Sequence, residues 1–219
     1  MLRILDQLLS KKLAKMRKPH GFDMPVWCGF FLNEVENIQM EWKQYKEKIG
    51  EGVFIDELSK DQELLNEDKK WKALFLYGYS FLNEKELMHF PETAKLIQNN
   101  LDEITLVMLS TTESGKHIPA HTGNNHGVLR LQIGIDITEP EKCSLRVEDK
   151  TVQLKEKEIF IFDDTFAHEL VNNSNSNRTV LIIDYYKPLP FWYRVLNKRK
   201  IAEIAKSDYV QSVINKITK

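Results

Sequence analysis

VLRLQIGIDI, residues 128–137, is the stretch of sequence that decides the fold class. Polar and apolar residues alternate along it, and successive side chains of a β-strand point to opposite faces of a sheet. The pattern predicts a strand with Arg130 and Gln132 on one face. The apolar residues are expected on the other face: Leu131, Ile133, Ile135 and Ile137.

Similar β-rich runs recur from residue 101 to residue 190, separated by turn-forming clusters. They cover residues 104–109, 144–147, 151–154, 158–162 and 179–186. Short strands at regular spacing are typical of an antiparallel sandwich or barrel. Closing such strands into a jelly roll protects their edges and leaves a mouth for a ligand. We therefore expect a mainly β, α+β fold: a double-stranded β-helix, or jelly roll, with flanking helices.

The remaining sequence predicts the helices around this core. Residues 1–100 are expected to form a largely helical flanking segment, with helices near 33–48 and 91–100 and a charged loop over 59–70. Residues 191–219 are expected to form a C-terminal helix. At 219 residues the chain suits a single domain, residues 1–219, better than two domains with separate cores.

Composition limits the classes of function. Hydrophobic residues make up 42% and charged residues 29%, as in a soluble globular protein. The net charge of −1 gives no reason to expect a nucleic-acid partner. Cys28 and Cys143 lie far apart and are expected to be small buried residues. With no signal peptide and no apolar stretch of the ~20 residues that a membrane span needs, the expected location is cytoplasmic. The pattern leaves the oligomeric state open.

Residues 2–18 predict an amphipathic helix with leucines on one side and six basic residues mostly on the other. Two interpretations remain open. The helix can pack on the domain as a terminal element, or it can make weak contact with an anionic membrane surface, as basic amphipathic helices do.

Two histidines stand out as candidate metal ligands. His121 lies in a Pro-Ala-His-Thr-Gly connection before the strand at 128, and His168 lies just after the run that ends at 162. Histidines at strand ends of one barrel can meet in space and hold non-haem iron, although imidazole also suits zinc and copper. The carboxylate that usually follows two residues after the first histidine is replaced here by Gly123. A zinc site from His117 and His121 is the alternative, but a proline between them disfavours the helix it needs.

Charged and polar residues near these histidines suit an acidic ligand. If the polar face of strand 128–137 lines the barrel mouth, Arg130 and Gln132 can bind a carboxylate by charge-assisted hydrogen bonds. Arg178, ten residues after His168, adds a second cation suited to a dicarboxylate. The other interpretation is an ordinary solvated face.

Residues 110–188 resemble the catalytic domain of the aspartyl/asparaginyl β-hydroxylases, a family that also includes bacterial lipid A hydroxylases. The resemblance rests on several motifs in order: Ser110 with Gly115, Pro-Ala-His-Thr-Gly ending at 123, Leu-Arg-Leu-Gln-Ile-Gly at 129–134, Phe-Asp-Asp-Thr-Phe-Ala-His-Glu at 162–169, Arg178, and Asp184 near Pro188. A weaker similarity lies at 71–76 and 90–94. The resemblance as a whole implies a jelly roll that uses Fe(II), the co-substrate 2-oxoglutarate and O₂.

The same resemblance implies roles for individual residues. His121 and His168 would bind iron(II), and Gly123 fits the family, which has glycine at that position. Arg178 would pair with the distal carboxylate of 2-oxoglutarate, assisted by Ser110 and Arg130. Trp71 would lie near the substrate pocket. Gln132 stands where the family usually has histidine, and unlike histidine it cannot carry a positive charge in contact with the co-substrate.

The resemblance implies a dioxygenase that hydroxylates an aspartyl, asparaginyl or related amino-acid substrate, so the expected partner is an amino acid, peptide or protein. Two alternative functions remain open. One is an enzyme that hydroxylates lipid A acyl chains, which the basic residues 2–18 favour. The other is a catalytically weak or silent binding relative, which Gln132 favours.

Overall fold

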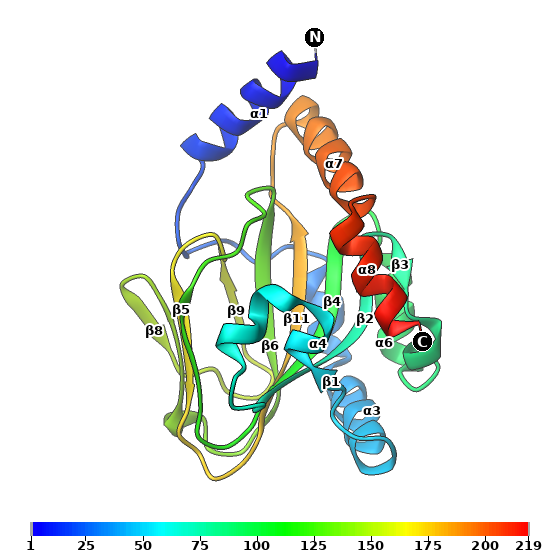
Figure 1. The fold of residues 1–219 in the computed structure, drawn as a ribbon, viewed down its shortest axis with the longest axis vertical. Coiled ribbons are helices and arrows are strands. Elements are labelled where there is room, and N and C mark those ends of the chain that lie inside the picture. Colours follow the sequence, from blue (N-terminus) through cyan, green and yellow to red (C-terminus); the bar gives the residue numbers. More distant parts are fainter. Residues whose placement is uncertain (1, 219) are drawn as a thin grey trace.

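The computed structural model describes residues 2–218, and its centre is a pair of antiparallel sheets (Figure 1). The larger sheet has the strand order β1-β2-β4-β11-β6-β9, with β3 paired to β2. The smaller sheet has the order β5-β10-β7-β8. The bounds are β1 Val53–Phe54, β2 Trp71–Gly78, β3 Phe81–Leu82, β4 Ile104–Thr112, β5 Lys116–His121, β6 Val128–Ile137, β7 Cys143–Val147, β8 Lys150–Val152, β9 Ile159–Phe162, β10 His168–Asn172 and β11 Arg178–Tyr186. The two sheets face each other as a jelly roll, as expected.

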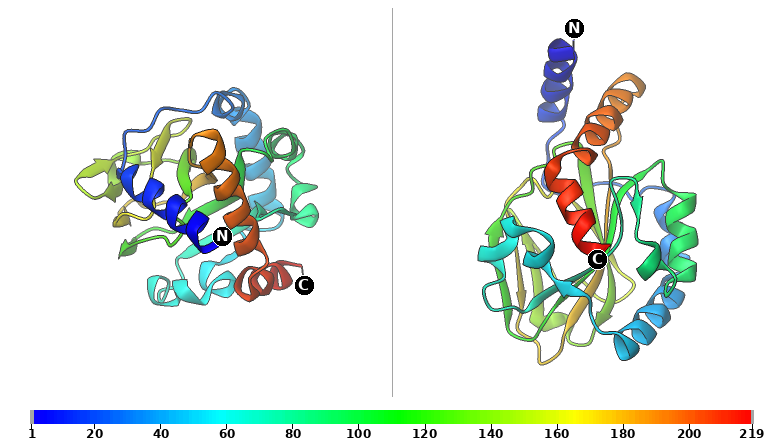
Figure 2. Two further views of the ribbon diagram at one scale, coloured as in Figure 1. Left: turned by 90° about the horizontal axis from the view of Figure 1, so that it is seen from above. Right: turned by 45° about the vertical axis from the view of Figure 1, so that its right-hand side comes forward.

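Helices cover one face of the larger sheet and extend beyond one end of the barrel (Figures 1 and 2). Their bounds are α1 Leu2–Lys15, α2 Cys28–Asn33, α3 Val35–Lys48, α4 Ile55–Leu58, α5 Glu84–Leu87, α6 Pro91–Asn99, α7 Phe191–Ala205 and α8 Asp208–Ile217, with 3₁₀ turns at Lys60–Leu65 and Pro140–Lys142. The expected C-terminal helix is in fact two, because the chain turns at Ser207, whose hydroxyl caps α8 by accepting from the Val210 amide.

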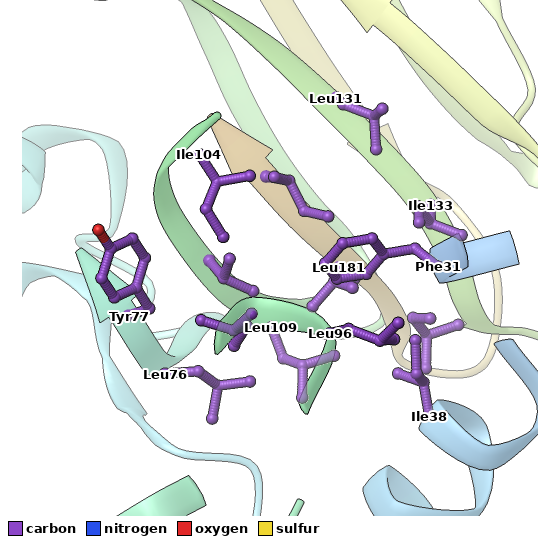
Figure 3. Close-up of a cluster of buried hydrophobic side chains, with 14 of the residues drawn as sticks. Phe31, Ile38, Leu76, Tyr77, Leu96, Ile104, Leu109, Leu131, Ile133 and Leu181 are labelled. Atoms are coloured by element: carbon purple, nitrogen blue, oxygen red, sulfur yellow. The ribbon is translucent and has the colours of Figure 1, made fainter. Parts of the chain in front are cut away.

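The larger sheet separates two hydrophobic cores. Its outer face packs under α2, α3 and α6, with Phe31 and Ile38 of the helices against Leu109 and Leu131 of the strands (Figure 3). Its inner face meets the smaller sheet in a second core, which includes Phe162 and residues of β5, β7 and β10. Burial of apolar side chains at about 25 cal/mol per Å² drives both layers together. Cys28 belongs to the outer core and Cys143 to the inner one, and both are free and buried, as predicted.

Strand β6 differs from the expected alternation at one point. Asp136 pairs with Thr179, but Gly134 pairs with the next residue, Val180, so Ile135 is an extra residue in β6. This β-bulge reverses the order of the faces beyond it. Ile137 therefore packs in the inner core instead of sharing the outer face with Ile135, and Asp136 turns outward to pair with Lys46 of α3.

The jelly roll also begins earlier in the chain than residue 101. Strand β2 lies inside the segment expected to be largely helical, yet it pairs with β4 along nearly its whole length. Its residues are buried at almost every position, because helices cover one face and the barrel interior lies on the other. A strand buried on both faces loses the polar–apolar alternation by which strands are recognised.

Helix α1 packs on the domain through its apolar side. Leu9 and Leu13 are buried, and α1 lies against α7 in the part of the molecule that projects from the barrel (Figure 2). Among the described residues, no helix has both the length and the apolar character to cross a membrane.

Candidate metal centre and co-substrate pocket

The two histidines lie side by side on paired strands. His121 ends β5 and is in register with His168, the first residue of β10, and their ring centroids are 4.2 Å apart. Ile118 pairs with Leu170, so β5 spans three residues where β10 spans two. This bulge at Pro119 and Ala120 turns His121 to the same interior face as Ile118. The sequence suggested a loop here, because proline and glycine flank the histidine.

Hydrogen bonds fix which nitrogen each ring presents. Nδ1 of His121 lies 2.9 Å from the carbonyl oxygen of Pro119, and Nδ1 of His168 lies 3.0 Å from that of Phe166. A carbonyl only accepts, so each Nδ1 carries the proton and each Nε2 offers a lone pair. Burial, with the neighbouring His121 ring, lowers the pKa of His168 to about 3, and burial also lowers the pKa of His121. Two neutral imidazoles are the state that binds a metal.

A carboxylate occupies the space that a side chain at Gly123 would need. A Cβ atom built on Gly123 would lie 2.4 Å from Oδ2 of Asp164, and the Gly123 amide donates to the Asp164 carbonyl oxygen at 2.7 Å. Oδ1 of Asp164 is buried and has no hydrogen-bond partner in the described part of the chain, and burial raises the pKa of this carboxyl. The Asp164 carboxylate, from the loop before His168, thus occupies the space that a side chain at position 123 would fill.

Arg130 is held by acidic neighbours. Its Nε and Nη2 donate to the two oxygens of Asp184 at 2.8 Å each, and Nη2 lies 3.2 Å from Oδ2 of Asp164. Although burial lowers it, these carboxylates raise the pKa of Arg130 above its ordinary value. Asp184 was noted in the sequence only as part of a motif. The role of Arg130 in binding the co-substrate stays a prediction, because its guanidinium already pairs with Asp184 and Asp164.

Arg178 is different, because no carboxylate among residues 2–218 pairs with it. It is buried to 3% exposure, and its hydrogen-bond partner is Oε1 of Gln132, 3.3 Å from Nη2. Burial lowers the pKa of Arg178 to about 10, so the group remains cationic at neutral pH. A buried charge without a counter-ion is costly, typically several kcal/mol. The position is therefore suited to an anionic ligand.

Ser110 and Trp71 complete this side of the pocket. The indole Nε1 of Trp71 donates to Oγ of Ser110 at 2.9 Å, and the Trp71 ring lies 6.5 Å from that of His121. Ser110 is on β4 and Trp71 begins β2, so the contact depends on the pairing of two neighbouring strands. All seven residues singled out from the sequence line one cavity: Trp71, Ser110, His121, Arg130, Gln132, His168 and Arg178.

The cavity has a volume of about 350 Å³ and a wall that the sequence did not reveal. Helices α4 and α8 contribute apolar side chains to it, together with strand residues of the inner face. These include Ile55, Leu58, Met108, Val210, Val213 and Ile214. The apolar spacing of α8 predicts an amphipathic helix, but not its docking against α4, which lies about 150 residues earlier in the chain. Tyr79, also in the lining, adopts a left-handed backbone with φ of 50°.

The alternative zinc pair does not form. His117 lies on the outer side of β5, where its Nε2 is 2.7 Å from Oε1 of Glu169, while His121 faces the interior. Across the described part of the chain, no group of three His, Cys, Asp or Glu side chains converges as a ligand set. The histidines that face the interior side by side are therefore His121 and His168.

The family model described as aspartyl/asparaginyl beta-hydroxylase matches residues 33–188, more than half of the chain. The chain belongs to this hydroxylase family. An ornithine lipid ester-linked acyl 2-hydroxylase from Rhizobium tropici is 32% identical to this chain over 192 residues. The aligned residues cover 86% of this chain and 68% of the Rhizobium protein.

The aspartyl/asparaginyl beta-hydroxylases of mouse and human are each 27% identical to it, over 70% of this chain. The family member covers only 22% and 21% of those two proteins. Among solved structures, the cupin domain of an XRE family transcriptional regulator from Enterobacter cloacae aligns with 53% of the chain and 97% of that domain, with a TM-score of 0.38 and 11% identity. The cupin domain of Schizosaccharomyces pombe Cnp3 aligns with 43% of the chain and 61% of its own, with a TM-score of 0.34 and 13% identity.

Proposed function

We propose that this chain is an Fe(II)- and 2-oxoglutarate-dependent dioxygenase that hydroxylates a C–H bond. The observation that carries the proposal is the buried Arg178 guanidinium, which has no carboxylate partner among residues 2–218 and lies in the same cavity as two neutral histidines. A dicarboxylate that binds the metal at one end needs a cation at the other, and a buried arginine forms strong charge-assisted hydrogen bonds to such a group. Membership of the hydroxylase family supports the same chemistry.

The residues present fit a metal ion. Both Nε2 atoms are unprotonated and their rings lie side by side, and the hydrogen bonds from Nδ1 to backbone carbonyls hold each ring in place. Oδ1 of Asp164 is a buried acceptor to which no described residue donates, and it is suited to a hydrogen bond from water at the site. When bound, iron(II) with 2-oxoglutarate and O₂ supplies the oxidising power for hydroxylation.

The protein's own residues would bind and orient the co-substrate. Arg178 would donate to its distal carboxylate. The side-chain carbonyl oxygen of Gln132 accepts a hydrogen bond from Arg178, so the amide N–H groups of Gln132 would be oriented to donate to the same carboxylate. The Trp71 indole, held by Ser110, closes the side of the pocket next to His121 and limits the access of water.

For the substrate, we propose a lipid acyl chain. The apolar residues of α4 and α8 give the cavity a wall that suits a hydrocarbon chain better than the charged side chain of aspartate. The similarity to the Rhizobium tropici ornithine lipid acyl hydroxylase supports this choice. An aspartyl or asparaginyl substrate, which the sequence motifs alone favour, is the second candidate, and the names of the mammalian relatives support it.

The first experiment tests cofactor and co-substrate. Anaerobic addition of Fe(II) and then 2-oxoglutarate should give a metal-to-ligand absorption band, and admission of air should give succinate. His168→Ala should abolish both signals, while His89→Ala, an exposed histidine on the helical side, should leave them unchanged. Absence of the band in the unaltered protein would refute the proposal. A band without succinate would identify the silent binding relative.

The second experiment decides between substrates. An ester-linked acyl lipid dispersed in detergent and an aspartate-containing peptide are each incubated with the iron-loaded enzyme and analysed by mass spectrometry. We expect addition of one oxygen atom to the lipid acyl chain. Met108→Glu, which places a charge in the apolar wall, should reduce lipid hydroxylation but not succinate formation without substrate. Oxidation of the peptide alone would refute the acyl-chain proposal.

A further inference from the structure

Two helices from opposite ends of the chain form a basic part of the molecule. We name residues 5–18 and 191–206 the basic protrusion, because α1 and α7 project together beyond the barrel (Figure 2). These segments contain ten basic and two acidic residues, a net charge of +8, although the whole chain carries −1. The remaining residues therefore carry −9. The overall net charge of −1, which gave no reason to expect a nucleic-acid partner, conceals this asymmetry.

Some of these charges are available to a partner, whereas Arg194 and Lys198 already pair with Glu103 and Asp102 of the domain. Lys11 and Lys15 are exposed, and neither forms an ion pair with a residue that the structure describes. Arg199 and Lys200 share one acid, Glu203, on their own helix. Exposed charges within about 10 Å of each other act together on an anionic surface at moderate ionic strength.

Exposed aromatic side chains accompany the charges. Phe191 and Trp192, the first two residues of α7, are 68% and 76% exposed, and their rings contact each other edge to face at 5.2 Å. Val195 and Leu8 on the same two helices are also exposed. Leaving a large apolar cluster in water has no benefit for folding. Tryptophan and phenylalanine next to lysines and arginines are typical of helices that lie in the interface of a membrane.

The basic protrusion is attached to both loops that frame the histidines. Asn197 of α7 donates from Nδ2 to the carbonyl oxygen of Gly127 at 2.7 Å, in the loop that follows His121. Arg17, just after α1, donates to the carbonyl oxygen of Thr165 at 3.3 Å and lies over the Phe166 ring at 4.5 Å, in the loop that precedes His168. The basic protrusion is thus bonded to the two loops whose residues Asn125 and Asp164 line the cavity.

We propose that the basic protrusion docks the protein on an anionic lipid bilayer, with the cavity mouth facing the membrane. The positive charge is complementary to anionic headgroups, and Phe191 and Trp192 enter the interface. A nucleic acid would also match the charge, but the adjoining apolar cavity favours a lipid. The identity of the substrate drawn from the membrane rests on the proposed function. The docking surface rests on its charge, its exposed aromatic residues and the adjoining apolar cavity, and not on that function.

The proposal is tested on the full chain with vesicles of phosphatidylglycerol and of phosphatidylcholine. We expect sedimentation with the anionic vesicles only, reversed by high salt, and a blue shift of tryptophan emission on binding. Lys11→Gln with Lys15→Gln should weaken binding about fivefold per charge, from ~1 kcal/mol for each residue. The matched control is Lys43→Gln with Lys85→Gln, two exposed lysines elsewhere. Trp192→Ser should weaken binding and remove the blue shift, while Leu64→Ser, an equally exposed control, should not.

Three outcomes would overturn the docking surface: equal binding to both kinds of vesicle, equal effects of the test and control substitutions, or binding to a duplex oligonucleotide that matches binding to anionic vesicles and ignores Trp192→Ser. Succinate formation in vesicle-free solution is measured in parallel. It tests the proposed function independently, because the substituted lysines and Trp192 lie outside the cavity lining.

Discussion

A buried ion pair in the loop before His168 supports the most specific prediction. Nζ of Lys187, just after β11, donates to Oδ2 of Asp163 at 2.5 Å, and the two side chains are 3% and 0% exposed. Oδ1 of Asp163 accepts from the amide and the hydroxyl of Thr165 at 3.2 and 2.7 Å. The pair therefore holds the loop of residues 163–167 that leads into His168.

Lys187→Met keeps most of the side-chain volume but leaves the Asp163 carboxylate buried without a cation. Removing one partner of a fully buried pair costs about 3–5 kcal/mol. With a urea dependence of about 2 kcal/mol per M, the unfolding midpoint should fall by roughly 2 M. Asp163→Asn added to this variant should restore part of the loss, because it removes the uncompensated charge.

The matched control is Lys95→Met, whose partner Glu92 is on an exposed face of α6. Its midpoint should stay at that of the unaltered protein, because exposed pairs contribute little. Urea unfolding followed by circular dichroism measures all four proteins. Equal midpoints for Lys187→Met and Lys95→Met would show that the buried pair does not stabilise this loop, and would refute the reasoning.

Three further predictions concern single positions. Gly123→Ala should lower the free energy of unfolding, measured in urea, by about 1–3 kcal/mol, because its Cβ would collide with the Asp164 carboxylate. The control Gly29→Ala should not lower it, because a Cβ at Gly29 would meet no atom within 4 Å. Equal effects of the two substitutions would contradict the crowding at Gly123. Gln132→His should lower the KM for 2-oxoglutarate about tenfold at pH 6, because a protonated histidine adds one charge-assisted hydrogen bond of ~1.5 kcal/mol. The decrease in KM should be smaller at pH 8, where the histidine is neutral. A KM independent of pH would exclude this contact. Burial raises the pKa of Cys28 to about 12, so the folded chain keeps a thiol proton that the unfolded chain loses above its ordinary value of 9.0. Stability should therefore fall as pH rises from 9 towards 12, and more steeply than in Cys28→Ala, when thermal unfolding is followed across that range.

The sequence predicted the parts of the fold that are amphipathic or repeat a local pattern. The bounds of β6 are those read from its alternation, because Arg130 and Gln132 face the cavity while the leucines face the helices. The same rule failed at Ile137, since a bulge depends on the partner strand. It also failed for β2, whose two faces are both buried.

The candidate site was predicted in the same uneven way. The seven residues of the motifs converge on one cavity, but their mutual contacts could not be read from spacing. The carboxylate of Asp164 in the space beside Gly123 and the bond from Arg178 to Gln132 are products of strand register. The wall from α8 depends on a helix that docks across a long sequence separation, for which a single sequence carries no signal.

Strand β5 lies at the edge of the smaller sheet, with β10 as its neighbour. Pro119 removes one amide donor from it, and a bulge interrupts the ladder just before His121. Its end is therefore joined to the barrel by few backbone bonds. An ion shared by His121 and His168 would act as a cross-link between an edge strand and an interior one. Amide hydrogen exchange in residues 116–121 should therefore slow on metal loading far more than exchange in β6. Such a result would show that the metal ion also stabilises the edge of the smaller sheet.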